Sequence, residues 1–470
     1  MKRRKAMQAI PLSIAGVYGF TRSAFGKNMC ENKACADKNG SLAMGYRNKI
    51  IERLTWVREN QSESLMEAAY AIARTYENGG QCYQVSWDAG HSEADSWAGR
   101  NGEPEIFSTA YNADKLKKGD LILTCAQIGD AAVLKKKGVF IIGCPSSWSG
   151  DARYPELLRE EIQLMRLKPH ADLWIENNAT SLGGVVLVPG MPAPIGPVSG
   201  CMGKVTIWMM LADACRILAR RGIKVPVKGD EPKITGENID YRNFSGWVDL
   251  NTPLMDDYFN EIMNQMELIT AETGTIKKIA AMCVDSVLNG GKIYGYSLHN
   301  SVAGEASTRR SGLSITRGVD KAALDTAEKR KNFGGTSKDC VIMGITKPDD
   351  EFDLTALDLF KKRGMKVASI GAMTRSHAKQ TGRKVYDETL YHAGKMCDTY
   401  GLFAVPGFEQ RICPTSGVLL DQLYWSTMME VVEQYIERTG DVPGVYLSGA
   451  LKGGMEHLYR MNELYSGNEY

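Results

Sequence analysis

Two short segments, one in each half of the chain, combine a histidine with a nearby glutamate. His91 is followed by Glu93 in the first half, and His299 is followed by Glu305 in the second half. A carboxylate with a raised pKa can remove and return a proton, and a histidine that titrates near neutrality can act as an acid or a base. These four residues are the candidate catalytic residues. The alternative is a structural histidine and a glutamate that complements a helix dipole.

A second set of polar side chains could bind the oxygens of a ligand. An arginine can hold a carboxylate or phosphate through two parallel hydrogen bonds, or it can lie on a solvated helix face. A hydroxyl just before a long helix can bind a ligand oxygen or cap the helix. The candidate substrate-binding residues are Ser92, Asn177, Asn178, Ser199, Arg309, Thr415 and Ser416. No Cys/His cluster has zinc spacing, so we predict no metal site and no cofactor.

The elements that must position these residues recur in the same order in both halves. Helical periodicity predicts an amphipathic helix early in each half, followed by a second helix that ends at Asn-Gly-Gly and then by a short strand. The paired ranges are 46–59 with 258–270 for the first helix, 78–80 with 289–291 for Asn-Gly-Gly, and 81–86 with 292–297 for the strand.

The later landmarks also correspond. Two further apolar runs in each half are typical of buried parallel strands. Pro197-Val198-Ser199-Gly200 opens a long apolar helix, and Pro414-Thr415-Ser416-Gly417 opens its counterpart. Strands that alternate with helices of ten or more residues predict an α/β fold, with two tandem αβα doubly wound parallel-sheet domains of flavodoxin-like type. The predicted domains are 41–224 and 256–470, with 225–255 as a linker and 1–40 as an extension.

Composition excludes several classes of protein. The chain has 470 residues, of which 43% are hydrophobic and 24% charged, and its formal net charge is +2. Such a balance, without a basic stripe, gives no reason to expect nucleic-acid binding. The apolar stretch 205–219 is interrupted by charges and too short for a bilayer, so we expect no stable membrane insertion. The eleven cysteines are scattered through apolar runs, and buried thiols are favoured over a disulfide framework.

The N-terminus has some features of an export signal. Arg3-Arg4 precedes an apolar run at 9–20, which resembles a twin-arginine signal, but Lys5 and Ala6 depart from its pattern. A periplasmic or otherwise exported location is expected if the segment is functional. A plain N-terminal extension on a cytoplasmic protein is the alternative.

Several motifs resemble the bacterial sugar isomerase (SIS) domain family. The family reads A-D-x-x-I-D-N, a β excursion and then G-P-[TV]-S-T, and the first half has a similar pattern over 171–178 and 196–200. Gly90-His91-Ser92 is similar to its G-x-G-H-S loop, and the second half follows its H…E…R…G spacing from His299 to Gly312. The resemblance implies SIS-type domains and a carbohydrate-derivative ligand. The phosphate-binding loop departs from the family pattern, because 124–130 and 344–350 lack its serines and contain aspartates.

The resemblance implies an enzyme that acts on a sugar or sugar derivative. The leading hypothesis is an aldose–ketose isomerase in which Glu305 or Glu93, with His299 or His91, transfers a proton. The second half keeps the family's His…Glu…Arg spacing better, whereas the first half keeps the segment before Ser199 better. Since each half keeps a different part of the family site, we expect a composite site at a cleft between the domains. A sugar etherase or lyase and a non-catalytic sugar-binding or sensing protein are the alternatives. A homodimer is left open.

Overall fold

The structure is a computed structural model, and thirteen stretches of the chain are described. They are residues 41–85, 102–108, 110–124, 131–144, 168–180, 183–229, 234, 246–298, 302–307, 309–371, 382–394, 401–449 and 451–466. The candidate residues His91, Ser92, Glu93 and His299 lie outside the described residues, as does the predicted N-terminal signal.

The first half folds around a five-stranded parallel sheet. Its strands are β1 (Cys82–Val85), β3 (Phe107–Ser108), β4 (Leu121–Thr124), β5 (Phe140–Gly143) and β6 (Leu173–Trp174), in the order β3-β1-β4-β5-β6. Every residue of β4 is buried. This burial on both faces explains why β4 reads as an uninterrupted apolar run rather than as an alternating pattern.

The second half repeats this topology. Its strands are β10 (Ile293–Ser297), β11 (Thr316–Val319), β12 (Cys340–Ile345), β13 (Lys366–Gly371) and β14 (His392–Ala393), in the order β11-β10-β12-β13-β14. All pairings in both sheets are parallel. Within each sheet the second strand of the chain lies outside the first, as in doubly wound flavodoxin-like sheets. The predicted fold class is confirmed.

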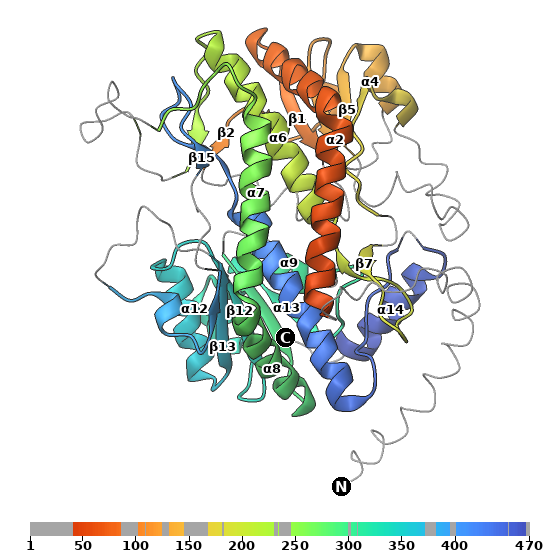
Figure 1. The fold of residues 1–470 in the computed structure, drawn as a ribbon, viewed down its shortest axis with the longest axis vertical. Coiled ribbons are helices and arrows are strands. Elements are labelled where there is room, and N and C mark those ends of the chain that lie inside the picture. Colours follow the sequence, from red (N-terminus) through yellow and green to blue (C-terminus); the bar gives the residue numbers. More distant parts are fainter. Residues whose placement is uncertain are drawn as a thin grey trace.

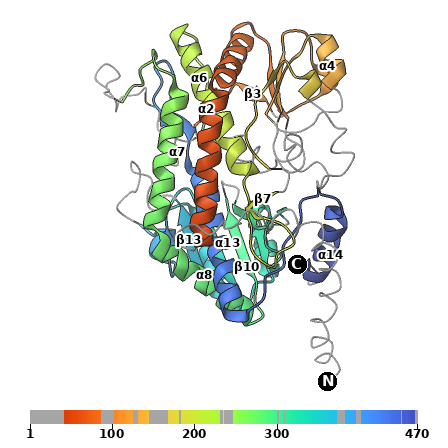
Figure 2. The same ribbon diagram turned by 45° about the vertical axis from the view of Figure 1, so that its right-hand side comes forward.

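Long helices run alongside both sheets and connect the two halves (Figures 1 and 2). They are α2 (Leu42–Glu77), α6 (Ser199–Arg220), α7 (Leu254–Ala271), α8 (Thr273–Leu288) and α13 (Ser416–Thr439). Helix α2 packs on α6 of its own half and on α13 of the other half, and α7 packs on α6. The two halves therefore meet through helices rather than through their sheets.

One sequence prediction about these helices is wrong. Two helices were expected before Asn78 in the first half, but α2 is a single helix of 36 residues. In the second half the chain does break, between α7 and α8 at Glu272. The residues after this break are Thr273, Gly274 and Thr275, and glycine and β-branched residues weaken a helix. The first half has Asn60-Gln61-Ser62 at the corresponding place, without a glycine.

A short antiparallel hairpin precedes each of the last long helices. Strands β7 (Gly184–Val186) and β8 (Ile195–Pro197) lead into α6, and β15 (Gly401–Phe403) and β16 (Ile412–Pro414) lead into α13. A third pair joins β2 (Glu103–Pro104) to β9 (Val227–Lys228), so part of the predicted linker is structured. The remaining elements are α4 (Ala131–Lys137), α9 (Val302–Ala306), α10 (Lys321–Leu324), α11 (Ala327–Asn332), α12 (Glu351–Lys362), α14 (Gly454–Ser466) and the 3₁₀ turns η2 (Ala113–Lys115), η4 (Lys168–His170) and η5 (Val385–Asp387).

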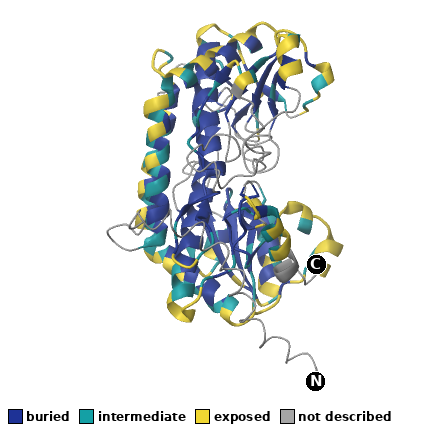
Figure 3. Ribbon diagram, turned by 90° about the vertical axis from the view of Figure 1, so that its right-hand side faces the viewer, coloured by how far each residue is buried: buried dark blue, intermediate teal, exposed yellow. Residues whose placement is uncertain are grey.

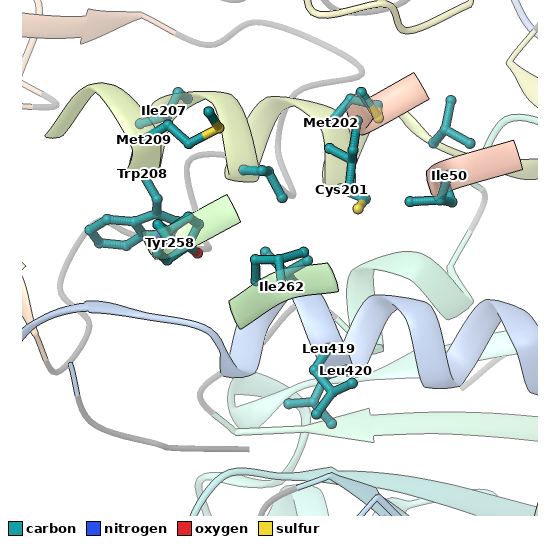
Figure 4. Packing of buried hydrophobic residues seen from close by; sticks show 14 of the residues in the cluster. Ile50, Cys201, Met202, Ile207, Trp208, Met209, Tyr258, Ile262, Leu419 and Leu420 are labelled. Carbon is teal, nitrogen blue, oxygen red and sulfur yellow. The ribbon is translucent and has the colours of Figure 1, made fainter. Parts of the chain in front are cut away.

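The main hydrophobic core is shared by the two halves. A single cluster of buried side chains draws on α2, α6, α7, α8 and α13. Most residues of α6 and α13 are buried, whereas α7 keeps an exposed face (Figure 3). Figure 4 shows Trp208 of α6 close to Tyr258 and Ile262 of α7, with Leu419 and Leu420 of α13 in the same cluster. The halves are thus joined by a continuous hydrophobic core.

The described residues bear on two expectations from composition, the absence of a membrane-spanning segment and the burial of free thiols. Among the described helices, none is long and apolar enough to cross a membrane. The cysteines of the described segments are unpaired and buried: Cys82, Cys144, Cys201, Cys215, Cys283, Cys340 and Cys413. Burial raises the pKa of the Cys82 thiol to about 12, so this thiol is protonated and acts as a small apolar group.

Candidate functional site

Glu305 lies in α9, the short helix that follows β10, close to the carboxyl edge of the second sheet. Ser297, the last residue of β10, holds the start of α9 because its hydroxyl accepts a hydrogen bond from the Ala303 N–H at 2.9 Å. The side chain of Glu305 is 2% exposed. In doubly wound sheets, ligands bind beyond the carboxyl ends of the strands. The position of Glu305 therefore fits a ligand-binding site.

The two carboxylate oxygens of Glu305 have different environments. Oε2 accepts a hydrogen bond from the indole N–H of Trp425 at 2.8 Å and lies 3.2 Å from Nε of Arg309. Oε1 is buried and has no hydrogen-bond partner within the described part of the chain. A buried carboxylate oxygen without a partner is costly, so native structures rarely contain one without a functional reason. Among the described residues, Oε1 is therefore a candidate acceptor for a ligand.

Arg309 connects Glu305 to the other half of the chain. Its guanidinium Nη2 donates a hydrogen bond to the Ser199 hydroxyl at 2.8 Å, and Ser199 is the first residue of α6. The structure thus brings together three of the candidate residues, Glu305, Arg309 and Ser199, although 110 residues separate the last two. The cluster that they form draws on both halves.

Several ionisable groups around Glu305 set its protonation. Burial is the main cause that raises the pKa of Glu305, and Asp421 raises it further, whereas Arg309, Lys204 and the Trp425 hydrogen bond lower it. Lys204 and Asp421 form a buried ion pair next to this site. A carboxyl group whose pKa lies above its usual range is better suited to exchange protons near neutral pH than an ordinary surface glutamate.

The other described candidates lie in local structure. The Asn177 side chain accepts a hydrogen bond from the Ala179 N–H at 3.1 Å, and Asn178 adopts a left-handed conformation with φ of 56°. The Thr415 hydroxyl accepts a hydrogen bond from the side chain of Gln265 at 2.9 Å, and Ser416 opens α13. Neither α6 nor α13 has a side-chain cap at its N-terminus. None of these four residues has a hydrogen bond to Glu305 among the described contacts.

Three residues of the cluster were not identified from the sequence: Lys204, Asp421 and Trp425. Each lies inside a long helix of largely apolar sequence, and no role was predicted for any of them. A signal was nevertheless present, because Lys204 and Asp421 are charged residues within runs that predict buried helices. Charged side chains are almost never fully buried unless they are paired.

The start of α12 is unsuited to a phosphate in the second half. In phosphate sites of this kind, free N–H groups at a helix N-terminus meet the anion. Here the carboxylate of Asp350 accepts those hydrogen bonds, from the N–H of Phe352 at 2.9 Å and of Asp353 at 3.2 Å. Asp353 itself is buried one turn further on. An anion at this position would have to displace a carboxylate and face a second carboxyl group.

Asp353 predicts a dependence of stability on pH. Burial, followed by the charge of Asp350, raises the pKa of Asp353 to about 8. Because this value exceeds that of the unfolded chain, the folded state binds the proton more tightly, so the stability from Asp353 is lost as pH rises through about 8. In the Asp353→Asn variant, the free energy of unfolding should fall less between about pH 6 and about pH 9 than in the wild type. Urea unfolding across this range measures the difference.

A variant on the same helix serves as the control for this prediction. Asp358 is exposed and pairs with Arg383, which lowers the pKa of its carboxyl group. Asp358→Asn should therefore leave the slope of stability above neutral pH unchanged. An unchanged slope in Asp353→Asn as well would contradict a protonated Asp353 in the folded state.

The described residues include no cluster of three or more His, Cys, Asp or Glu side chains that could hold a metal ion. The described groups at the site are the Glu305 carboxylate, the Arg309 guanidinium, the Ser199 hydroxyl and the Trp425 indole. Together the fold and the site define a doubly wound α/β protein of two halves, in which a buried ionisable cluster is built from both.

Comparisons with known proteins found distant similarity to solved structures alone. No family model and no curated protein matches the sequence. Among solved structures, a Clostridium difficile 630 protein assigned as a phosphosugar isomerase has 10% identity, covers 85% of this chain and 95% of its own, and has a TM-score of 0.46. A Salmonella typhimurium LT2 protein assigned as a sugar binding protein has 9% identity, coverage of 84% and 99%, and a TM-score of 0.43.

A third similar structure is the C-terminal domain of glucosamine-fructose-6-phosphate aminotransferase from Francisella tularensis. It has 10% identity and a TM-score of 0.40, and the match covers 82% of this chain and 95% of that domain. At these identities and TM-scores the likeness leaves the ligand and the reaction of this chain open.

Proposed function

We propose that this chain is a SIS-type protein that binds a carbohydrate derivative at the cluster of Glu305, Arg309 and Ser199, and that it isomerises this ligand by proton transfer. The observation that carries the proposal is the buried Oε1 of Glu305, which has no hydrogen-bond partner among the described residues. The motif resemblance over both halves gives the ligand class.

Each side chain has a distinct role in the proposed reaction. The Glu305 carboxylate removes a proton from the carbon beside the substrate carbonyl, and the carbonyl oxygen takes up the charge as an enediolate. A proton then passes from the neighbouring hydroxyl oxygen to this oxygen, and protonated Glu305 returns its proton to the former carbonyl carbon, so that the carbonyl has moved by one carbon. The Arg309 guanidinium lies beside Glu305 and favours negative charge on the enediol oxygen. The Ser199 hydroxyl accepts a hydrogen bond from Arg309 and so fixes the orientation of the guanidinium.

We further propose that the ligand lacks a phosphate group at the usual family position. The carboxylate of Asp350 already accepts the N–H groups at the start of α12 in the second half. Carboxylates accept hydrogen bonds from sugar hydroxyls, whereas they repel a phosphate dianion. A neutral sugar derivative is therefore the preferred ligand.

A ligand screen followed by an exchange experiment tests the proposed function. We expect free sugar derivatives to raise the melting temperature in a thermal-shift screen, and the matching sugar phosphates to give no larger shift. NMR of each hit incubated with the protein in D₂O should then show deuterium at the carbon beside the carbonyl. Binding without exchange or product would instead support the sensing alternative. A cleaved product would support the etherase or lyase alternative.

A further inference from the structure

Lys204 of α6 and Asp421 of α13 form an ion pair at the centre of the molecule. The Nζ atom of Lys204 donates to Oδ2 of Asp421, and their side chains are 0% and 2% exposed. Burying two charges is costly, and a pair of this kind often contributes little net stability compared with apolar residues of the same volume. Its presence in the shared core therefore calls for an explanation other than stability.

The two residues occupy corresponding positions in the two halves. Helix α6 begins at Ser199 and α13 begins at Ser416, each directly after a matching Pro-x sequence. Lys204 is five residues after Ser199 (204 − 199), and Asp421 is five residues after Ser416 (421 − 416). The ion pair thus joins a residue of one half to its own counterpart in the other half.

Contacts between the halves are reciprocal around this pair. The Gly196 N–H donates to the Ser311 carbonyl at 3.2 Å, and the Cys413 N–H donates to the Gly102 carbonyl at 3.1 Å. Gly196 and Cys413 each lie three residues before the first residue of the last long helix in their half (199 − 196 and 416 − 413). Both have positive φ, of 76° and 63°. Each half therefore contacts the other with the same backbone positions.

The start of the first helix in each half is also bound by the last long helix of the other half, although the two acceptors lie at different positions along their helices. Asp213 of α6 accepts a hydrogen bond from the Met255 N–H at the start of α7, at 3.0 Å. Glu433 of α13 accepts one from the Leu42 N–H at the start of α2, also at 3.0 Å. The two halves are thus arranged like the subunits of a two-fold symmetric dimer, in which a residue near the axis faces its own copy.

We propose that Lys204 and Asp421 make the two halves of this chain complementary only to each other. In this arrangement, two first halves would bury a lysine against a lysine, and two second halves an aspartate against an aspartate. A buried like-charge pair is strongly unfavourable. The pair thereby excludes both pairings of identical halves and leaves only the pairing of a first half with a second half. This inference does not depend on the proposed function.

Charge reversal in the full chain tests the proposal. Lys204→Asp places two aspartates in the core, and Asp421→Lys places two lysines there. We expect each single variant to melt about 10 °C or more below the wild type, or to fail to refold. The double variant Lys204→Asp/Asp421→Lys restores opposite charges within one chain, so it should refold as a monomer and regain most of the lost melting temperature.

A mixture of the two single variants gives a sharper result. When both are unfolded and refolded together, the first half of each can pair with the second half of the other, which restores opposite charges in both cores. Light scattering should then show a folded species of two chains that neither variant forms alone. Single variants that refold and melt like the wild type would overturn the proposal. A mixture with no more folded protein than the separate samples would also overturn it.

An exposed ion pair serves as the matched control. Lys329 pairs with Asp325 on the surface of the second half, with side chains 50% and 41% exposed. Lys329→Asp makes the same change of charge without burying it, so its melting temperature should remain within a few degrees of the wild type. A loss as large as that of Lys204→Asp would mean that net charge, rather than the buried position, causes the effect.

Discussion

The Glu305→Gln variant should lose about 10²–10⁴-fold of the rate at which the protein exchanges deuterium into a bound sugar derivative. The amide has the shape of the carboxylate and can still accept the hydrogen bond from Trp425, but it cannot remove a proton. The ligand should still raise the melting temperature, because Arg309 and Ser199 remain in place. NMR in D₂O measures the exchange rate, and a thermal-shift titration measures binding.

Two comparisons sharpen this prediction. Glu328→Gln, on the exposed face of α11, makes the same chemical change away from the site and should leave exchange unchanged. Ser199→Ala removes the acceptor of Arg309 and should weaken ligand binding, because the guanidinium loses its orientation. If Glu305→Gln exchanges at the wild-type rate, Glu305 is not the base. If Glu305→Gln loses exchange while Ser199→Ala binds and exchanges the ligand like the wild type, the site is not shared between the halves.

Asp213→Asn is expected to have a large effect on stability. The Asp213 carboxylate is fully buried, pairs with Arg216 and accepts hydrogen bonds from the N–H groups of Leu254 and Met255. The amide would leave the guanidinium of Arg216 without its counter-charge, although the carbonyl of Leu250 still accepts a bond from it. We expect a loss of about 3–5 kcal/mol in the free energy of unfolding, measured by urea denaturation.

The loss should be specific to the buried position. Asp325→Asn removes an acidic partner from an exposed pair in the second half and should cost less than about 1 kcal/mol. Because Asp213 belongs to the first half and Met255 starts α7 in the second, Asp213→Asn should weaken both halves in one cooperative transition. Separate transitions for the two halves would contradict a continuous shared core.

The strands and helices could be predicted from the sequence because the signals for burial and for helix ends lie in neighbouring residues. Uninterrupted apolar runs such as Leu121–Thr124 are buried on both faces of a parallel sheet, so their composition predicts their position. The helix start at Ser199 and the stop at Asn78 also follow from neighbouring residues alone. The division of 42–77 was wrong because no local glycine or proline forces a break there, and packing against α6 and α13 extends along the helix.

The candidate site could be recognised only by combining residue types from the sequence with distances from the folded chain. Glu305, Arg309 and Ser199 were identified from residue type and from motif resemblance, and their proximity became evident only in the folded chain. Trp425 was missed because a tryptophan inside an apolar helix has the same pattern whether its indole N–H is idle or donates to a carboxylate. Its role depends on which helix lies opposite.

By itself the sequence determined the order of strands and helices, the repetition of that order, and the residue types available for proton transfer. Short-range physics governs these features, because burial and backbone preference act on adjacent residues. Only the tertiary structure decided that Ser199 of one half meets Arg309 of the other, and that Lys204 faces Asp421. Such contacts join residues more than a hundred positions apart, and their energies depend on how the helices pack rather than on any local pattern.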